Sequence, residues 1–444
     1  MINPKRHALV LAVAATLALP GAAMATNGYF GHGYGVKSKG MAGAGVAMPL
    51  DAMDATTNPA NMVNVGSRID AGVTWFSPRR SYTVDQVGPF LGPQTGAFSL
   101  IPGTFESDNE NFLIPNFGWN HMIDDVSSVG ITLAGNGGMN TEYKNVTFPG
   151  NPPGFPTGTY YAGDAGVDLM QLATLVTYAR QVNDQVSLGI SGIFALARFK
   201  AIGVGSFAGF STDPANVSNN GYETSTGFGV KVGITGEVTD GFSLGASYQS
   251  KIDMSELDDY AGLFAEEGDF DVPATWTIGA KFSPAKEHTI LLDYQQIDYT
   301  DVAAISNPMM PNLGMCFGGD PTSCMGGSNG PGFGWEDTGV IKVGYQYDAG
   351  NWQARAGYSH NDQPVPDSET MFNILAPGVV EDHWTLGFTT NVSKNSSLDF
   401  SFMYAPSTEV TGGNPLAATP AGDTQLITIE MEQYEIGVNY TWTY

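Results

Sequence analysis

A strict alternation between large apolar residues and small or polar residues recurs along the chain from Arg68 to the C-terminus. In the last stretch one face of a strand holds Tyr434, Ile436, Val438, Tyr440, Trp442 and Tyr444. The other face holds Glu435, Gly437, Asn439, Thr441 and Thr443. Because successive side chains of a strand point to opposite faces, this period of two predicts strands with one apolar and one polar face. Most stretches carry an aromatic residue at one end, as strands do when one face meets lipid.

With weaker stretches near 110–121, 127–143 and 169–180, the chain offers about 14 strands, an even number that suits a closed barrel. Short connections near 123–126, 183–185, 239–241, 284–287, 348–351 and 393–395 alternate with long ones near 78–108, 144–166, 203–222, 255–269, 303–337, 361–380 and 405–425. A soluble sandwich or propeller has no reason for this alternation. We therefore expect an all-β fold, a 14-stranded antiparallel transmembrane β-barrel over residues 67–444, with its long loops outside the cell.

The N-terminus is organised differently. Lys5 and Arg6 precede an apolar run over residues 8–19 and the sequence Ala23-Met24-Ala25, which predicts a cleaved signal peptide over residues 1–25. No later segment is long and apolar enough for a helical membrane span. Residues 26–66 are Gly-rich at first and do not alternate, so they either hang below the barrel or fold inward as a plug.

Charge and motifs exclude several functions. The 18 Lys and Arg against 44 Asp and Glu give a formal net charge of −26, which argues against a nucleic-acid partner. No nucleophile elbow or H-E-x-x-H motif surrounds any histidine, so we expect no enzyme. The six histidines are His7, His32, His121, His288, His360 and His383.

The two cysteines, Cys316 and Cys324, are expected to form one disulfide, because an exported chain meets an oxidising compartment. No histidine lies near them in the sequence, so this stretch has too few ligands for a metal site. We expect no metal and no cofactor.

Several fragments, taken in order, resemble the FadL/TodX (OmpP1) family of outer-membrane transporters for long-chain fatty acids and other hydrophobic compounds. They are Ser38-Lys39-Gly40-Met41-Ala42-Gly43, Asn58-Pro59-Ala60, the stretch from Gly130 to Tyr143, Val186-Ser187-Leu188-Gly189, Ala197-Arg198 and Asp362-Gln363-Pro364-Val365-Pro366. The resemblance implies a monomeric barrel in the Gram-negative outer membrane, surrounded by lipid and lipopolysaccharide, whose lumen is plugged by a hatch over residues 26–66. It also implies an extracellular capture groove, an inner pocket and a lateral exit where the third strand is kinked.

The residues suggest where these parts lie. Gly135, Gly137 and Gly138 interrupt the third strand and predict its kink, unless they simply end the strand early. Apolar loop residues at helical spacing predict an amphipathic helix. This helix and two aromatic residues of the preceding long loop would line the groove. The groove set is Phe207, Phe210, Leu257, Tyr260, Leu263 and Phe264, and the alternative is loop packing without any ligand.

The charge of the ligand stays open. By the resemblance, the family's carboxylate-binding positions fall near Gly203 and at Glu336, neither of them basic, so a fatty acid would depend on other cations in the lumen or pocket. The candidates are Arg198, Lys200, Lys342 and Arg355. A neutral hydrocarbon needs no counter-charge. We expect passive transport of hydrophobic compounds, and the alternative is a general diffusion porin for small hydrophilic solutes.

Overall fold

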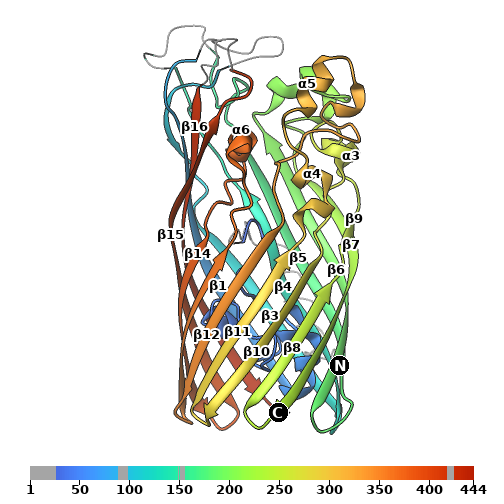
Figure 1. Cartoon of the computed structure of the whole chain (residues 1–444), viewed down its shortest axis with the longest axis vertical. Coiled ribbons are helices and arrows are strands. Elements are labelled where there is room, and N and C mark those ends of the chain that lie inside the picture. Colours follow the sequence, from blue (N-terminus) through green and yellow to red (C-terminus); the bar gives the residue numbers. More distant parts are fainter. Residues whose placement is uncertain (1–26, 89–98, 149, 151–155, 418–424) are drawn as a thin grey trace, which may run out of the picture.

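The wall of the molecule is one closed antiparallel sheet, because β1 (Arg68–Val84) pairs both with β3 (Phe112–Asp124) and with β16 (Leu426–Thr443). The computed structural model describes residues 27–88, 99–148, 150, 156–417 and 425–444, so the expected signal peptide lies outside the described residues. Of the 16 strands in the sheet, β2 (Gly103–Glu106) and β9 (Asp253–Met254) are short additions to β1 and β7. The remaining 14 form the barrel, which confirms the expected fold (Figure 1).

The other wall strands are β4 (Ser127–Asn140), β5 (Gly166–Gln181), β6 (Val186–Ile202), β7 (Glu223–Thr239), β8 (Phe242–Gln249), β10 (Thr275–Ala285), β11 (His288–Ile297), β12 (Thr338–Asp348), β13 (Trp352–Asn361), β14 (Asp382–Ser393) and β15 (Ser396–Gly413). Short turns lie at the end that holds the C-terminus and long connections at the other, as predicted (Figure 1). Among the described residues no helix is long and apolar enough to cross a membrane.

Two expected loops are shorter than predicted. β1 continues to Val84, inside the connection expected over residues 78–108. We expected a connection over residues 405–425, but β15 continues to Gly413. The strand passes Pro406 with a shift in register between Ala405 and Thr408. Because a bulge leaves one residue unpaired, proline does not have to end the strand.

The outer face of the barrel is apolar. Val176, Phe228 and Leu386 are 61%, 69% and 60% exposed, values that suit side chains meant for lipid. Aromatic residues gather at the C-terminal rim, where Trp119 Nε1 donates to Tyr444 Oη at 2.8 Å. An apolar band with an aromatic edge is what the bilayer requires of such a wall.

The N-terminal segment from Asn27 to Gly66 lies inside the barrel, where Figure 1 shows it in blue. It contains α2 (Val36–Lys39), η1 (Asp54–Thr56) and η2 (Pro59–Asn64). Wall carboxylates accept hydrogen bonds from its backbone: Asp293 Oδ2 lies 2.7 Å from Gly45 N and 2.9 Å from Val46 N. The wall thus satisfies part of its polar backbone, and hydrogen bonds within the segment satisfy more of it, as burial requires.

Glycines of the wall allow this segment to approach the strands closely. A Cβ atom on Gly189, Gly245 or Gly357 would come within 3.0 Å of hatch backbone atoms from Pro59, Val46 and Met41 respectively. Further wall glycines whose Cβ would come that close to hatch atoms are Gly118, Gly130, Gly233, Gly279 and Gly344. The hatch from about Met41 to Met62 is therefore seated directly on wall backbone.

The extracellular connections hold only short helices: η3 (Gly205–Phe210), η4 (Pro214–Asn216), η5 (Asp258–Tyr260), α3 (Ala265–Gly268), η6 (Tyr299–Asp301), α4 (Ala303–Ser306), α5 (Asn312–Phe317), η7 (Pro321–Ser323), η8 (Asp367–Glu369) and α6 (Thr370–Asn373). The prediction of an amphipathic helix is wrong. η5 and α3 are separate, and Glu266 and Glu267 have positive φ angles of 57° and 61°, which a right-handed helix excludes.

Candidate functional site: an apolar pocket above the hatch

The loops enclose an apolar pocket above the hatch. Its lining comes from four loops and from β5, and it contains no charged residue: Val167, Val204, Phe207, Leu263, Phe264, Ala304, Met325, Pro331, Gly332, Phe333, Phe372 and Leu375. The free volume of this pocket is only about 30 Å³. An aromatic molecule therefore enters only if side chains or the hatch move.

The six residues expected to line a capture groove gather in and around this pocket. Phe207, Leu263 and Phe264 line it directly, and all three are buried. Tyr260 and Phe264 pack edge-on against Phe199 of β6, with ring centroids 4.8 Å and 5.0 Å away. Leu257 is buried too, and Phe210 is half-buried. These side chains thus belong to the packed interior of the loops.

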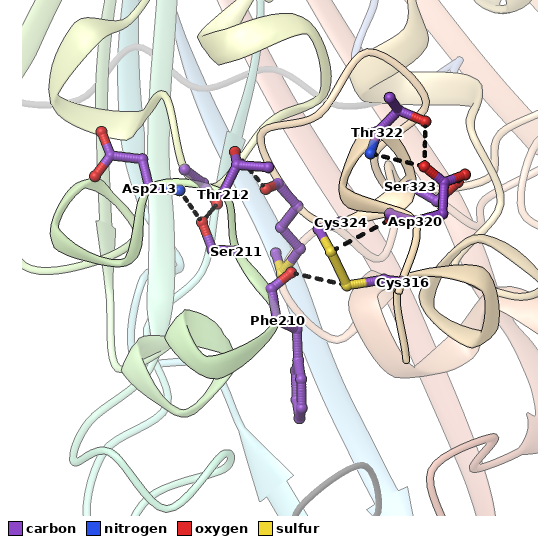
Figure 2. Close-up of a disulfide and its surroundings, with 11 residues drawn as sticks. Phe210, Ser211, Thr212, Asp213, Cys316, Asp320, Thr322, Ser323 and Cys324 are labelled. Carbon is purple, nitrogen blue, oxygen red and sulfur yellow. Dashed lines mark hydrogen bonds between the residues drawn. A yellow bond between two sulfur atoms is a disulfide. The ribbon is translucent and has the colours of Figure 1, made fainter. Parts of the chain in front are cut away.

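A disulfide joins Cys316 and Cys324 beside the pocket, with the two Cα atoms 4.8 Å apart (Figure 2). The loop that it closes packs against η3. Cys316 Sγ lies 3.7 Å from Phe210 O, and the rings of Phe210 and Phe317 have centroids 5.1 Å apart. Two backbone hydrogen bonds, Thr212 N to Met325 O and Met325 N to Phe210 O, tie the loops together. The disulfide therefore constrains the loop that covers the pocket, and this loop is called the roof of the pocket below.

An aromatic cluster connects the pocket with the first residues of the hatch. Tyr29 is fully buried among Tyr299, Trp335 and Phe270, with ring centroids 5.7, 6.1 and 6.5 Å away. Phe270 in turn lies 4.8 Å from Phe264, which lines the pocket. The ring contacts thus run without a break from the pocket lining to Tyr29 of the hatch.

Acidic residues lie at the edge of the cluster. Lys251 Nζ contacts Asp271 Oδ2 at 2.5 Å. Burial raises the pKa of the neighbouring Asp269 to about 6, and the negative charge of Asp271 adds to the effect.

The hatch also reaches the third wall strand. β4 carries a bulge, seen as a register shift between Gly135 and Gly137, and it then continues to Asn140. The strand therefore continues past the glycines with a bulge and does not end there. Just beyond the bulge, Gly138 N donates to Tyr29 O at 3.3 Å. Tyr29 thus touches both the aromatic cluster and the bulged strand.

The Asn58-Pro59-Ala60 motif fixes the lower hatch to β7. Asn58 Oδ1 accepts from Ala60 N and caps η2. Asn58 Nδ2 donates to Val46 O, Ile234 O and Thr235 Oγ1 at 2.7, 3.0 and 3.0 Å. This side chain binds two hatch segments and the wall together.

The expected lumen cations divide into two groups, and the prediction is wrong for one. Arg198 and Lys200 point out of the barrel, where the Arg198 guanidinium and the Lys200 ammonium lie 3.5 and 4.7 Å from the ring centre of Tyr222. Their neighbours Ala197 and Phe199 point inward instead. Lys342 and Arg355 do face the lumen and are buried, but neither lines the apolar pocket.

Sequence reasoning missed Tyr29, Tyr299 and Trp335, which make the link between pocket and hatch. The only signal was the aromatic pair Tyr29-Phe30 in a Gly-rich segment. Among the described residues, no group of three or more His, Cys, Asp or Glu side chains could hold a metal ion.

A plugged barrel with an apolar pocket under its loops defines the class of outer-membrane transport proteins. The model of one family, "Outer membrane protein transport protein (OMPP1/FadL/TodX)", matches residues 12–444. The chain belongs to this family, which confirms the resemblance seen in the sequence.

Solved structures with the same fold include the toluene transporter TodX of Pseudomonas putida, with a TM-score of 0.67 and 16% identity over 93% of this chain and 99% of that one. A FadL homologue of Pseudomonas aeruginosa has a TM-score of 0.65 and 17% identity over 94% and 99%. The toluene transporter TbuX of Ralstonia pickettii has a TM-score of 0.61 and 17% identity over 93% and 99%. None of the curated protein sequences matches this chain.

Proposed function

We propose that the protein takes up neutral hydrophobic compounds, including aromatic hydrocarbons, passively across the outer membrane. The observation that carries this proposal is the lining of the loop pocket, which offers apolar side chains and no charge. A carboxylate placed there would lack a counter-charge, because Arg198 and Lys200 point outward. A hydrocarbon gains about 25 cal/mol for each Å² of apolar surface that it buries.

The route continues along the contacts of Tyr29. Ligand entry would displace the aromatic cluster, break the Gly138 N to Tyr29 O hydrogen bond and uncover the bulge of β4. From there the compound would leave sideways into the membrane. Such a shift requires that the ligand bind the displaced hatch better than the seated one. The lower hatch, held on wall glycines, would stay in place and keep hydrophilic solutes out.

We further propose that the barrel acts as a monomer in contact with outer-membrane lipid and lipopolysaccharide. Arg198 and Lys200 support a lipopolysaccharide contact, because they lie on the outer face at the extracellular side of the exposed Phe194 and Phe228. Phosphate groups of the outer leaflet would meet these cations at that level.

The test is uptake of toluene and of a long-chain fatty acid by cells that lack other such channels. In the variant Ala304→Trp an indole replaces a buried methyl group of the pocket, and we expect toluene uptake to fall at least tenfold. The control is Ala71→Trp on the lipid-facing side of β1, which should behave as the wild type.

Fatty-acid uptake without toluene uptake would contradict the neutral-ligand proposal. Free entry of small sugars through the intact protein would favour the diffusion-porin alternative.

A further inference from the structure

A small polar cavity lies between the first part of the hatch and the barrel wall, and it shares no lining residue with the apolar pocket. Hatch residues 30–34 form one side. Five neighbouring strands form the other, through Lys231, Gln249, Thr275, Thr277, Gln295 and Lys342. The free volume of this cavity is about 30 Å³. That is enough for one or two waters or one small ion, since about 10–15 Å³ holds a single water.

Two buried ammonium groups line this cavity without a carboxylate partner. Lys231 and Lys342 are 6% and 5% exposed. Lys342 Nζ donates to His32 O at 3.0 Å, whereas within the described part of the chain Lys231 makes no hydrogen bond and no ion pair. A charged group removed from water without a partner is costly, so a counter-charge is expected nearby.

One oxygen of the nearest candidate carboxylate is already engaged, and the other, Asp293 Oδ1, has no hydrogen-bond partner among the described residues. Asp293 pairs with Lys342 across β11 and β12, but it lies beyond ion-pair distance, and its Oδ2 accepts from Gly45 N and Val46 N. The Asp293 carboxylate thus holds the hatch backbone at Gly45 and Val46. Its single negative charge balances at most one of the two lysines.

Other donors around the cavity also lack partners. Within the described residues, Gln249 Nε2 and both ring nitrogens of His32 are buried without a hydrogen bond, and a neutral imidazole donates from one of its two nitrogens. Lys231, Gln249 and Thr275 stand side by side in one row across β7, β8 and β10. Buried polar groups are nearly always paired, so this set of donors points to an occupant that accepts hydrogen bonds.

We propose that the cavity binds one small monovalent anion between Lys231 and Lys342. The occupant is a free halide or the carboxylate end of a longer molecule, because both carry one negative charge and fit about 30 Å³. It would connect the segment that carries His32 to the wall and so hold the first hatch residues in place. The site is separate from the apolar pocket and does not depend on which compound crosses the barrel.

The direct test uses bromide as the probe. Crystals of the full barrel soaked in sodium bromide should show an anomalous peak between Lys231 and Lys342. In solution, bromide or acetate should raise the midpoint of thermal unfolding in a saturable way, compared with sodium sulfate at equal ionic strength. Lys231→Met should lose both effects. Lys281→Met, which removes another barrel lysine that does not line the cavity, should keep them.

Octanoate distinguishes the two sources of the anion. If octanoate removes the bromide peak, the carboxylate of a longer molecule reaches the site, and if the peak remains, the site serves free ions. Either result supports an anion site. The wild type overturns the proposal if it shows neither an anomalous peak nor a saturable shift, because water alone would then satisfy the donors.

Discussion

Lys39 Nζ donates to Glu435 Oε2 at 2.8 Å, and the side chains of both residues are almost fully buried. This ion pair joins the hatch to the last strand across 396 positions of the sequence. A buried ion pair of this kind adds little stability compared with an apolar pair. Removing one partner, however, leaves the other charge buried without compensation. It therefore acts as a specific lock between plug and wall.

Lys39→Met should loosen the hatch, because Glu435 keeps its buried charge without the ammonium. We expect a loss of about 3–5 kcal/mol in the free energy of hatch opening, measured by hydrogen exchange of amides from residues 36–64. The double variant Lys39→Met/Glu435→Met should recover much of this loss. Unchanged exchange in the single variant would show that the pair does not hold the hatch.

Gly189→Leu should displace the hatch, because the new side chain would collide with the backbone of Pro59 and Ala60. The expected result is entry of a hydrophilic antibiotic that the wild type excludes. Gly192→Leu on the same strand is the matched control, since its Cβ meets no atom within 4 Å. Equal entry in both variants would contradict the proposed seat.

Tyr29→Ala should ease displacement of the first hatch residues, because it removes a ring buried among Tyr299, Trp335 and Phe270 at a cost of about 3–5 kcal/mol. Toluene uptake at low concentration should rise severalfold. Tyr29→Phe should resemble the wild type, since the Tyr29 hydroxyl has no hydrogen-bond partner among the described residues. A Tyr29→Ala variant with wild-type uptake would remove Tyr29 from the route.

Replacing both Cys316 and Cys324 by Ser should loosen the roof of the pocket by roughly 2–3 kcal/mol, the chain-entropy value for so short a loop. Hydrogen exchange of residues 312–327 should become faster. A reductant should reproduce this change in the wild type and have no further effect on the variant. If the reductant also changed the variant, the effect would not arise from this bond.

Acidification should tighten the loop that holds Asp269. Its pKa of about 6 in the folded protein exceeds the value of about 3.9 for an unfolded carboxyl, so the folded loop binds more protons between these values. Loop packing is therefore most stable below about pH 4 and weakens as the pH rises through 6. Protease cleavage of residues 257–270 at several pH values measures this trend. Asp269→Asn should flatten it, and a trend of the opposite sign would contradict the assignment.

The strand pattern and the alternating connections determined the barrel from the sequence alone. Each strand meets lipid on one face, so its side chains had to alternate, and about 14 such stretches followed from counting. The disulfide and the bulge near Gly135 and Gly137 were predictable as well, because cysteine spacing and strand glycines are local signals.

Only the tertiary structure decided which side chains point into the barrel and which point out of it at the extracellular ends of the strands. Within the membrane the outer face is apolar, but above it water lies outside and the apolar pocket lies inside, so the two faces exchange character. On β6, Phe194 therefore faces lipid, whereas further along the strand Phe199 turns inward and Arg198 and Lys200 point out. The contacts of Tyr29 and the cavity at Lys231 likewise join segments far apart in the chain, and no local pattern in the sequence records such distances.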